Sequence, residues 1–185
     1  MKTLIFNGSP KEKGDTETLV NALALDLSGE VMIVSHRDRI APCSDCRYCR
    51  QNNGCSIQDK MQKVYPFLAI CDVIVLVSPI WFSSLSGPLL SICSRIQTIY
   101  CANRFRNEKI QIKPKSGVLI LVGAEKGTEQ QPARNALTIM KFMNVDRAGV
   151  EKIYSMDTDI VPAESDADAL ARCLTVAELL NKRYE

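Results

Sequence analysis

The sequence predicts an α/β fold, in which one parallel sheet has helices on both of its faces. Short runs rich in β-branched residues alternate with helical patterns along the chain, as in parallel α/β proteins. One run, DVIVLVS at 72–78, is apolar almost throughout, as expected for a central strand buried on both faces. The chain has 185 residues, of which 46% are apolar, so we expect residues 1–185 to form a single domain around one core.

Five strands and five helices account for most of the chain. The expected strands are Lys2–Asn7, Val31–Ser35, Asp72–Ser78, Gly117–Val122 and Gly149–Tyr154. The first expected helix is Thr16–Leu27, with Asp15 as its cap. A second helix begins after Asp59, and a third begins after Gly87-Pro88 and runs to Asn103. The fourth begins at Pro132, and the fifth begins after Ser165 and runs to Lys182. Because crossovers between parallel strands are right-handed, five strands favour the order 2-1-3-4-5 of a flavodoxin-like three-layer sandwich.

Composition and charge exclude several classes of protein. The net charge is +2 and 24% of the residues are charged, which indicates neither disorder nor a nucleic-acid-binding arm. No apolar run approaches the roughly 18 residues that suggest a membrane span, and the apolar stretch after Met1-Lys2 is too short for a signal peptide. We therefore expect a cytoplasmic protein without nucleic-acid or membrane partners.

The chain contains a single histidine, His36. A Ser-His-Asp triad would depend on that one residue, and a metal site made of two or three histidines is impossible. Chemistry in this chain is therefore expected from other side chains or from a bound cofactor.

A loop of hydroxyls, glycines and lysines, from Gly8 to Thr18, follows the first strand and leads into a helix. The N-terminus of a helix offers unpaired N–H groups and a partial positive charge, which stabilise a phosphate. Ser9, Thr16 and Thr18 supply the hydroxyl donors that a phosphate monoester needs. The spacing matches neither a Walker loop nor G-x-G-x-x-G, and an ordinary capped turn is the alternative interpretation.

The loops after the third and fourth strands also have the composition of ligand-binding segments. Trp81, the only tryptophan, stands beside Phe82 among serines and glycine, which suits the surface for a flat ring system. Gly123 ends the fourth strand and would let a ligand approach the backbone. Each loop alone is equally explained by core-anchored aromatics or a simple turn. Since the carboxyl ends of parallel strands share one edge, the three loops together predict a mononucleotide pocket.

Four of the eight cysteines cluster as Cys43, Cys46, Cys49 and Cys55, in an irregular insertion at about 40–58. The spacing C-x2-C-x2-C-x5-C resembles ferredoxin-type cluster-binding runs more than zinc sites, which use two separated pairs. Three assignments stay open: a 4Fe-4S cluster, structural zinc, and free thiols. The insertion follows the second strand, so we expect it beside the nucleotide pocket. The other cysteines are expected to pack in the core: Cys71, Cys93, Cys101 and Cys173.

These motifs resemble those of a known family. Asn7-Gly8-Ser9-Pro10-Lys11, followed by Asp15-Thr16, is similar to the phosphate loop of the NADPH-dependent FMN reductase family of flavodoxin-like proteins. Ser78-Pro79-Ile80-Trp81-Phe82 with Ser86-Gly87 resembles the second flavin loop of that family. Within the family, the run from Pro42-Cys43 to Cys55 resembles the iron–sulfur flavoproteins. The resemblance extends from the N-terminus to about Glu125.

The resemblance implies bound FMN, redox activity and a homodimer or homotetramer. By position in the motifs, the phosphate would be held by Ser9, Lys11, Asp15, Thr16 and Thr18. The ribityl chain and the ring would be lined by Pro79, Ile80, Trp81 and Phe82, with Gly123 approaching the ring. Two positions depart from the family: Asp15 stands where asparagine is common, and Gly123-Ala124 stands where a glycine pair is common. A carboxylate beside a dianionic phosphate weakens binding unless it caps the helix or lysines offset it.

We expect an FMN-dependent oxidoreductase without catalytic side chains, because a flavin itself performs the redox chemistry. Electrons would come from NAD(P)H as cosubstrate or from a ferredoxin-type carrier. They would pass to a small-molecule acceptor such as a quinone, a flavin or an oxygen species. Two alternatives stay open: a non-enzymatic redox module, and a flavodoxin-like scaffold with zinc on its cysteines.

Overall fold

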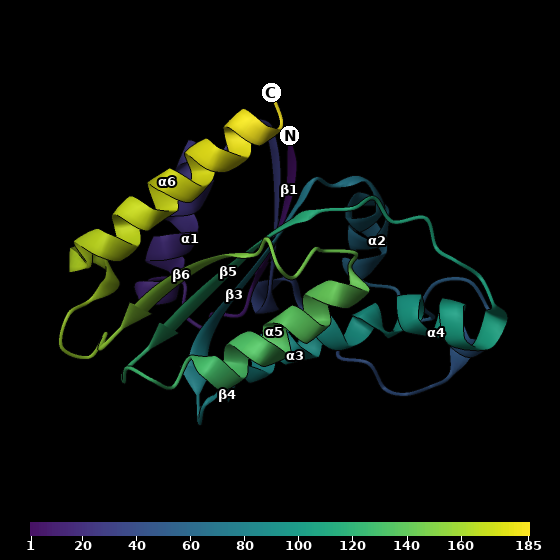
Figure 1. Ribbon diagram of the computed structural model, residues 1–185. Coiled ribbons are helices and arrows are strands. Elements are labelled where there is room, and N and C mark those ends of the chain that lie inside the picture. The colour runs from purple at the N-terminus through teal and green to yellow at the C-terminus, as the bar shows by residue number, and fades with distance from the viewer.

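The central element of the structure is a sheet of parallel strands in the spatial order β2-β1-β3-β5-β6 (Figure 1). The computed structural model describes residues 1–185. The parallel strands are β1 (Lys2–Asn7), β2 (Glu30–Ser35), β3 (Val73–Trp81), β5 (Ser116–Gly123) and β6 (Glu151–Met156). A short sixth strand, β4 (Ser84–Leu85), pairs antiparallel with the end of β3. Counted along the chain, the parallel strands have the predicted order 2-1-3-4-5, which is confirmed.

Helices cover both faces of the sheet. They are α1 (Asp15–Asp26), α2 (Met61–Ile70), α3 (Gly87–Cys93), α4 (Gln97–Arg106), α5 (Gln130–Phe142) and α6 (Ala167–Arg183). Short 3-10 turns lie at His36–Asp38, Tyr48–Arg50, Ser94–Ile96 and Ala163–Ser165. Figure 1 shows α1 and α6 together on one face, and α2, α3 and α5 on the other. No helix combines the length and the apolar composition that crossing a bilayer requires.

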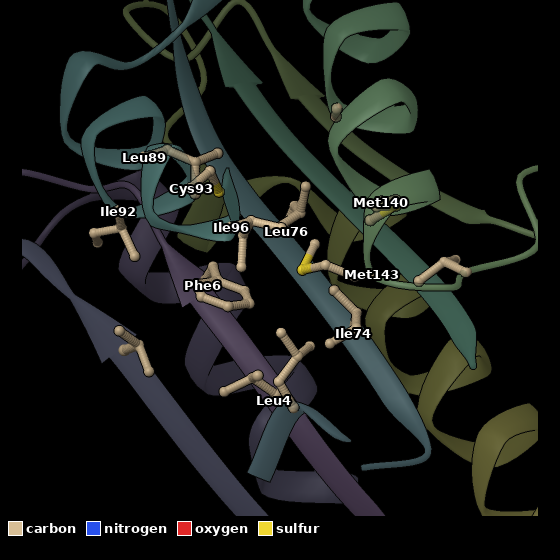
Figure 2. Packing of buried hydrophobic residues seen from close by; sticks show 14 of the residues in the cluster. Leu4, Phe6, Ile74, Leu76, Leu89, Ile92, Cys93, Ile96, Met140 and Met143 are labelled. Atoms are coloured by element: carbon tan, nitrogen blue, oxygen red, sulfur yellow. The ribbon is translucent and has the colours of Figure 1, made fainter. Parts of the chain in front are cut away.

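Side chains of β3 divide between two hydrophobic clusters, because successive residues of a strand point to opposite faces. Ile74 and Leu76 join the cluster under α2, α3 and α5, whereas Val75 faces α1 and α6. Figure 2 shows the first cluster, where Leu4 and Phe6 of β1 lie among residues of α3 and α5. Both faces of the sheet are filled by core, which leaves the carboxyl edge of the strands as the place where a ligand can reach it.

Several helix boundaries differ from the predicted ones. α5 begins at Gln130 and not at the predicted Pro132, which is the third residue of the helix. The predicted helix from Gly87 to Asn103 is two helices, α3 and α4, separated by the 3-10 turn Ser94–Ile96. The last helix is capped by Asp166, whose carboxylate accepts a hydrogen bond from an N–H of the first turn, and not by Ser165. At the start of the last helix, Ser165 and Asp166 are both suitable cap residues, so residue type alone does not decide between them.

β3 extends further than predicted, through residues expected to form a loop. It continues to Trp81 and turns back into β4, pairing Ile80 with Leu85. The turn has positive φ at both central residues, 50° at Phe82 and 53° at Ser83. Two-residue hairpins with positive φ usually contain Gly, Asn or Asp there. Because neither residue is of those types, the usual signal for this hairpin is missing from the sequence.

Gly8, directly after β1, has no room for a side chain. A Cβ atom there would lie 2.6 Å from both Leu89 Cβ and Ser86 Oγ, and 2.9 Å from the Val77 carbonyl oxygen. We expect Gly8→Ala to lower the free energy of unfolding by about 1–3 kcal/mol through overpacking. Urea unfolding measures the change. Gly87→Ala is the control, because no atom lies within 4 Å of its Cβ position. Equal unfolding free energies for the two variants would contradict the prediction.

Candidate functional site

The three loops expected to hold a ligand meet at one edge of the sheet. Because β1, β3 and β5 are parallel neighbours, the segments that follow them leave the sheet on the same side. The Gly8 N–H donates to the Val77 carbonyl (2.8 Å), and the Ser86 hydroxyl donates to the Gly8 carbonyl (2.8 Å). Pro79 pairs with Val122 near the end of β5. The loops after these strands therefore lie together, as expected.

A buried asparagine shapes the loop after β1. Asn7 is fully buried, and its side-chain oxygen accepts a hydrogen bond from the Ser9 N–H (2.9 Å). The Ser9 hydroxyl accepts one from the Lys11 N–H (3.2 Å), which curls the chain toward the start of α1. No side chain caps α1. Its first-turn N–H groups are therefore open to an anion, which fits the predicted phosphate site.

The three predicted phosphate-binding hydroxyls differ in whether they are already hydrogen-bonded within the protein. Thr18 donates to the Gly14 carbonyl (3.2 Å), and Ser9 donates to the Lys11 carbonyl (3.1 Å). Thr16 is buried, and its hydroxyl forms no hydrogen bond with the rest of the chain. A phosphate oxygen needs a donor. Thr16 is therefore the hydroxyl that can donate to a phosphate without breaking an existing bond.

Two carboxylates in the first turn of α1 have partners within the protein. Asp15 is the first residue of the helix and not its cap, which corrects the predicted role. Its carboxylate accepts a hydrogen bond from the Ala163 N–H (2.8 Å). Glu17 accepts hydrogen bonds from the Asn7 amide (2.7 Å) and from Arg37 (3.2 Å). With its carboxylate engaged, Asp15 can offer a phosphate only its backbone N–H.

The aromatic residues of the β3–β4 hairpin are on the surface. Trp81 is 42% exposed, and Phe82 is fully exposed. Aromatics anchored in the core, the alternative explanation of this segment, are therefore excluded. The Ser78 hydroxyl accepts a hydrogen bond from the Ser86 N–H (2.9 Å), which fixes the base of the hairpin. The hairpin presents apolar rings beside the loop after β1, which suits contact with a flat ring system.

Gly123 ends β5 close to this hairpin. A Cβ atom at Gly123 would lie 2.8 Å from Met156 Cε and 3.2 Å from Ile80 Cδ1. Its carbonyl accepts a hydrogen bond from the Thr158 N–H (3.2 Å). A ring that contacts the Gly123 backbone has to displace the Met156 side chain. Because methionine side chains are flexible, this displacement costs little free energy.

A buried arginine that no sequence motif marks anchors the cysteine-containing insertion. The Arg95 side chain is fully buried and pairs with Asp59 (2.6 Å). It also donates to the carbonyls of Ala41 (2.9 Å) and Ile57 (3.2 Å), near the two ends of the insertion. Burial alone would raise the pKa of Asp59, but hydrogen bonds from Arg95 and from backbone N–H groups lower it. The signal in the sequence is one charged residue within the apolar helix that follows Gly87.

The four clustered cysteines line one pocket of about 510 Å³, together with residues of α4. Cys43 and Cys46 are exposed, and Cys49 and Cys55 are half-buried, while the other four cysteines are buried as predicted. Four thiols around a shared cavity are the type of ligand that an iron–sulfur cluster or a zinc ion binds. No three metal-binding side chains are gathered closely enough to hold an ion. The assignment of these cysteines as metal ligands stays a prediction.

The position of this pocket differs from the predicted one. No residue that lines it comes from the loops after β1, β3 or β5. The insertion packs instead on the junction of α3 and α4, where the Cys43 N–H donates to the Ser94 hydroxyl (2.9 Å). Figure 1 shows the chain of this insertion beside α4. The expected contact between insertion and nucleotide pocket is not made within one chain, because Arg95 holds the insertion against these helices.

Two thiols of the pocket differ in acidity. The Ser56 hydroxyl lies 3.3 Å from the Cys46 sulfur and, together with the Tyr48 N–H, lowers the pKa of Cys46. Burial, and after it the neighbouring thiol of Cys101, raises the pKa of Cys49 to about 11. Cys46 therefore forms a thiolate more readily than Cys49 does.

Comparison with known proteins agrees with the resemblance seen in the motifs. The sequence model of the family described as NADPH-dependent FMN reductase matches residues 1–152. An iron-sulfur flavoprotein of Methanocaldococcus jannaschii is 29% identical over 136 residues, which are 71% of this chain and 66% of that protein. An iron-sulfur flavoprotein of Methanosarcina thermophila is 25% identical over 137 residues, which are 71% of this chain and 68% of that protein. The aligned part thus spans about two thirds of these relatives' length.

Solved structures with the same fold cover nearly the whole chain. An NAD(P)H:quinone oxidoreductase from Methanothermobacter marburgensis superimposes with a TM-score of 0.74 at 15% identity, over 97% of this chain and 96% of that one. An FMN-dependent NADH-azoreductase from Bacillus anthracis, in complex with FMN, gives a TM-score of 0.64 at 14% identity, over 98% of this chain and 100% of that one. At these identities the likeness establishes the flavodoxin-like fold.

Proposed function

The chain belongs to the NADPH-dependent FMN reductase family, and from that premise we propose that it is an FMN-dependent oxidoreductase. It takes electrons from NAD(P)H or from a ferredoxin-type carrier and passes them to a small acceptor such as a quinone, a flavin or an oxygen species. The observation that supports this most is the convergence of the loops after β1, β3 and β5 at one sheet edge.

The residues of this edge divide into a phosphate end and a ring end. At the phosphate end, the N–H groups of the first turn of α1 and the Thr16 hydroxyl donate hydrogen bonds, and the lysines of the preceding loop add positive charge. At the ring end, Trp81 and Phe82 of the hairpin provide apolar contact. Bound FMN supplies the electron transfer itself, and the protein positions the ring and sets the charge around it.

Thr16→Ala tests the phosphate end. We expect it to weaken FMN binding by about 1–2 kcal/mol, because the phosphate loses one hydrogen bond to a charged group. Quenching of FMN fluorescence during a titration measures the dissociation constant. Thr138→Ala, on the exposed side of α5, is the control, since its hydroxyl is bonded to the Arg134 carbonyl. Equal dissociation constants for Thr16→Ala and the unaltered chain would place the phosphate elsewhere.

The cysteine-containing insertion is proposed to hold a 4Fe-4S cluster that exchanges single electrons. Support comes from the four cysteines around one cavity and from the names of the two iron-sulfur flavoproteins above. Since the insertion does not reach the nucleotide edge of its own chain, electron exchange between the two sites calls for a second protomer. A homodimer or homotetramer is proposed for this reason, and the exposed Phe82 ring is consistent with it.

Stopped-flow absorbance under anaerobic conditions tests the proposed activity. Mixing the FMN-loaded protein with NADPH or NADH should bleach the flavin band. If only a reduced ferredoxin bleaches it, the carrier-fed route is correct and the direct reductase is wrong. If no donor bleaches it, the protein is not an oxidoreductase of this kind. A protein that binds no FMN would likewise not be an oxidoreductase of this kind.

A further inference from the structure

We propose that Cys49 and Cys101 form a redox-active pair that closes to an intramolecular disulfide. Cys101 lies on α4, outside the four-cysteine run, and the sequence predicts only core packing for it. The pairing itself requires neither bound FMN nor a metal. Only its consequence for a metal centre in the insertion rests on the proposed function.

The 3-10 turn that contains Cys49 is docked on α4 by two contacts. Arg106, at the end of α4, donates a hydrogen bond to the Cys49 carbonyl oxygen. The Arg50 guanidinium lies over the Phe105 ring, 4.6 Å from its centroid. A guanidinium over an aromatic ring is a favourable contact, and the hydrogen bond fixes the backbone of the turn. The turn therefore holds Cys49 in a defined position against α4.

The turn that contains Cys49 docks on the face of α4 that carries Cys101. Cys101 and Phe105 are four residues apart, so they share one face of α4. Since Arg50 lies over Phe105, the turn that contains Cys49 lies against this same face. Both cysteines line the same pocket. Cys101 is 6% exposed and Cys49 is half-buried, so solvent reaches the pair from the Cys49 side.

Electrostatic effects agree that the two thiols are neighbours. After burial, the thiol of Cys101 is what most raises the pKa of Cys49. The pKa of Arg106 is raised chiefly by Glu108, and both thiols contribute to the same shift, so its guanidinium is close to both. Cys93 differs, because burial alone raises its pKa to about 12 and no other thiol contributes. Cys101 is thus a buried cysteine with a thiol partner.

The proposed reaction is thiol–disulfide exchange with an oxidised low-molecular-weight disulfide, RSSR. One thiol of the pair, as the thiolate, attacks one sulfur of RSSR, and the first RS⁻ leaves. The thiolate of the other cysteine then attacks the sulfur so modified, which forms the Cys49–Cys101 bond and releases the second RS⁻. In all, the protein gives up two electrons and two protons, and RSSR becomes two RSH.

Closure of this pair removes one ligand from the insertion. A metal or iron–sulfur centre binds thiolates, and a sulfur in a disulfide is no longer one. With Cys49 bonded to Cys101, the insertion is one thiolate short of its four. The disulfide and a complete four-cysteine centre therefore exclude each other, and reduction of the disulfide restores the full set.

Peptide mapping tests the pair directly. Trypsin releases Cys49 in Tyr48–Arg50 and Cys101 in Ile96–Arg104, and neither peptide contains a second cysteine. The full chain, with FMN bound and iron removed by a chelator, is equilibrated with oxidised glutathione. It is then alkylated and digested without reductant. We expect these two peptides joined by a disulfide.

Matched variants separate this pair from general oxidation. Cys101→Ala should abolish the linked peptides, and Cys93→Ala, which removes a buried thiol of α3, should leave them. The proposal is overturned if Cys101 remains fully alkylated, or if Cys49 is joined to another cysteine of the insertion. Iron is measured in a separate, untreated sample, so absence of a cluster would leave the result for the pair unaffected.

Discussion

Replacing the buried arginine with methionine, Arg95→Met, is expected to lower the free energy of unfolding by about 3–5 kcal/mol. The Arg95 side chain is fully buried and the Asp59 side chain is only 14% exposed. The substitution leaves the Asp59 carboxylate without its partner, in surroundings where an unpaired charge is costly. The carbonyls of Ala41 and Ile57 lose their donor as well. The expected loss is a large part of the roughly 5–15 kcal/mol that stabilises a folded domain.

Urea unfolding followed by circular dichroism measures this loss. The double variant Arg95→Met/Asp59→Leu should recover part of it, because neither partner is then left unpaired. Arg39→Met, at an exposed arginine, is the control and should change the free energy of unfolding by less than about 0.5 kcal/mol. A loss of under about 1 kcal/mol for Arg95→Met, the size of an exposed ion pair, would contradict the role of Arg95 as a buried anchor.

The second large effect concerns iron. Cys46→Ser should abolish the iron content of protein purified without oxygen, because an iron–sulfur cluster loses a thiolate ligand. FMN should stay bound, since the pocket that Cys46 lines shares no residue with the loops after β1, β3 and β5. The variant therefore separates the two proposed sites of one chain.

Iron content and flavin absorbance of the same sample measure this effect. Gln51→Ala, at an exposed residue of the insertion that does not line the pocket, is the control and should keep both iron and flavin. Unchanged iron in Cys46→Ser would exclude Cys46 as a ligand. Zinc in place of iron in the unaltered chain would make the structural zinc site the correct alternative. Loss of FMN together with iron would contradict the separation of the two sites.

The sheet could be predicted from the sequence because the information for it is local. The strands that became β3 and β5 are nearly continuous apolar runs, which are typical of strands buried on both faces, and β1 has a shorter apolar centre at Leu4–Phe6. Right-handed crossovers then leave few strand orders to choose from. The edge at which the three loops meet follows from parallel strands alone. Ser9, Trp81 and Gly123 are at that edge for this reason.

Contacts between distant residues could not be predicted in the same way. Asp15 has the right type for a helix cap, yet its carboxylate binds the N–H of Ala163, 148 residues later. The partners of Arg95 and the proximity of Cys101 to the insertion depend likewise on how helices pack. The sequence does not predict the β3–β4 hairpin for a local reason, since its turn residues are not those that favour positive φ.

A crystal structure of the full chain grown with FMN tests most directly whether the loops after β1, β3 and β5 hold one flavin. We predict the phosphate at the N-terminus of α1, within hydrogen-bonding distance of the Thr16 hydroxyl, and the ring against the hairpin at Trp81. The chain also has an apolar groove between α3, α4 and α5, lined by residues such as Leu90 and Tyr100. Flavin bound in that groove, with the edge of the sheet left without it, would contradict this account.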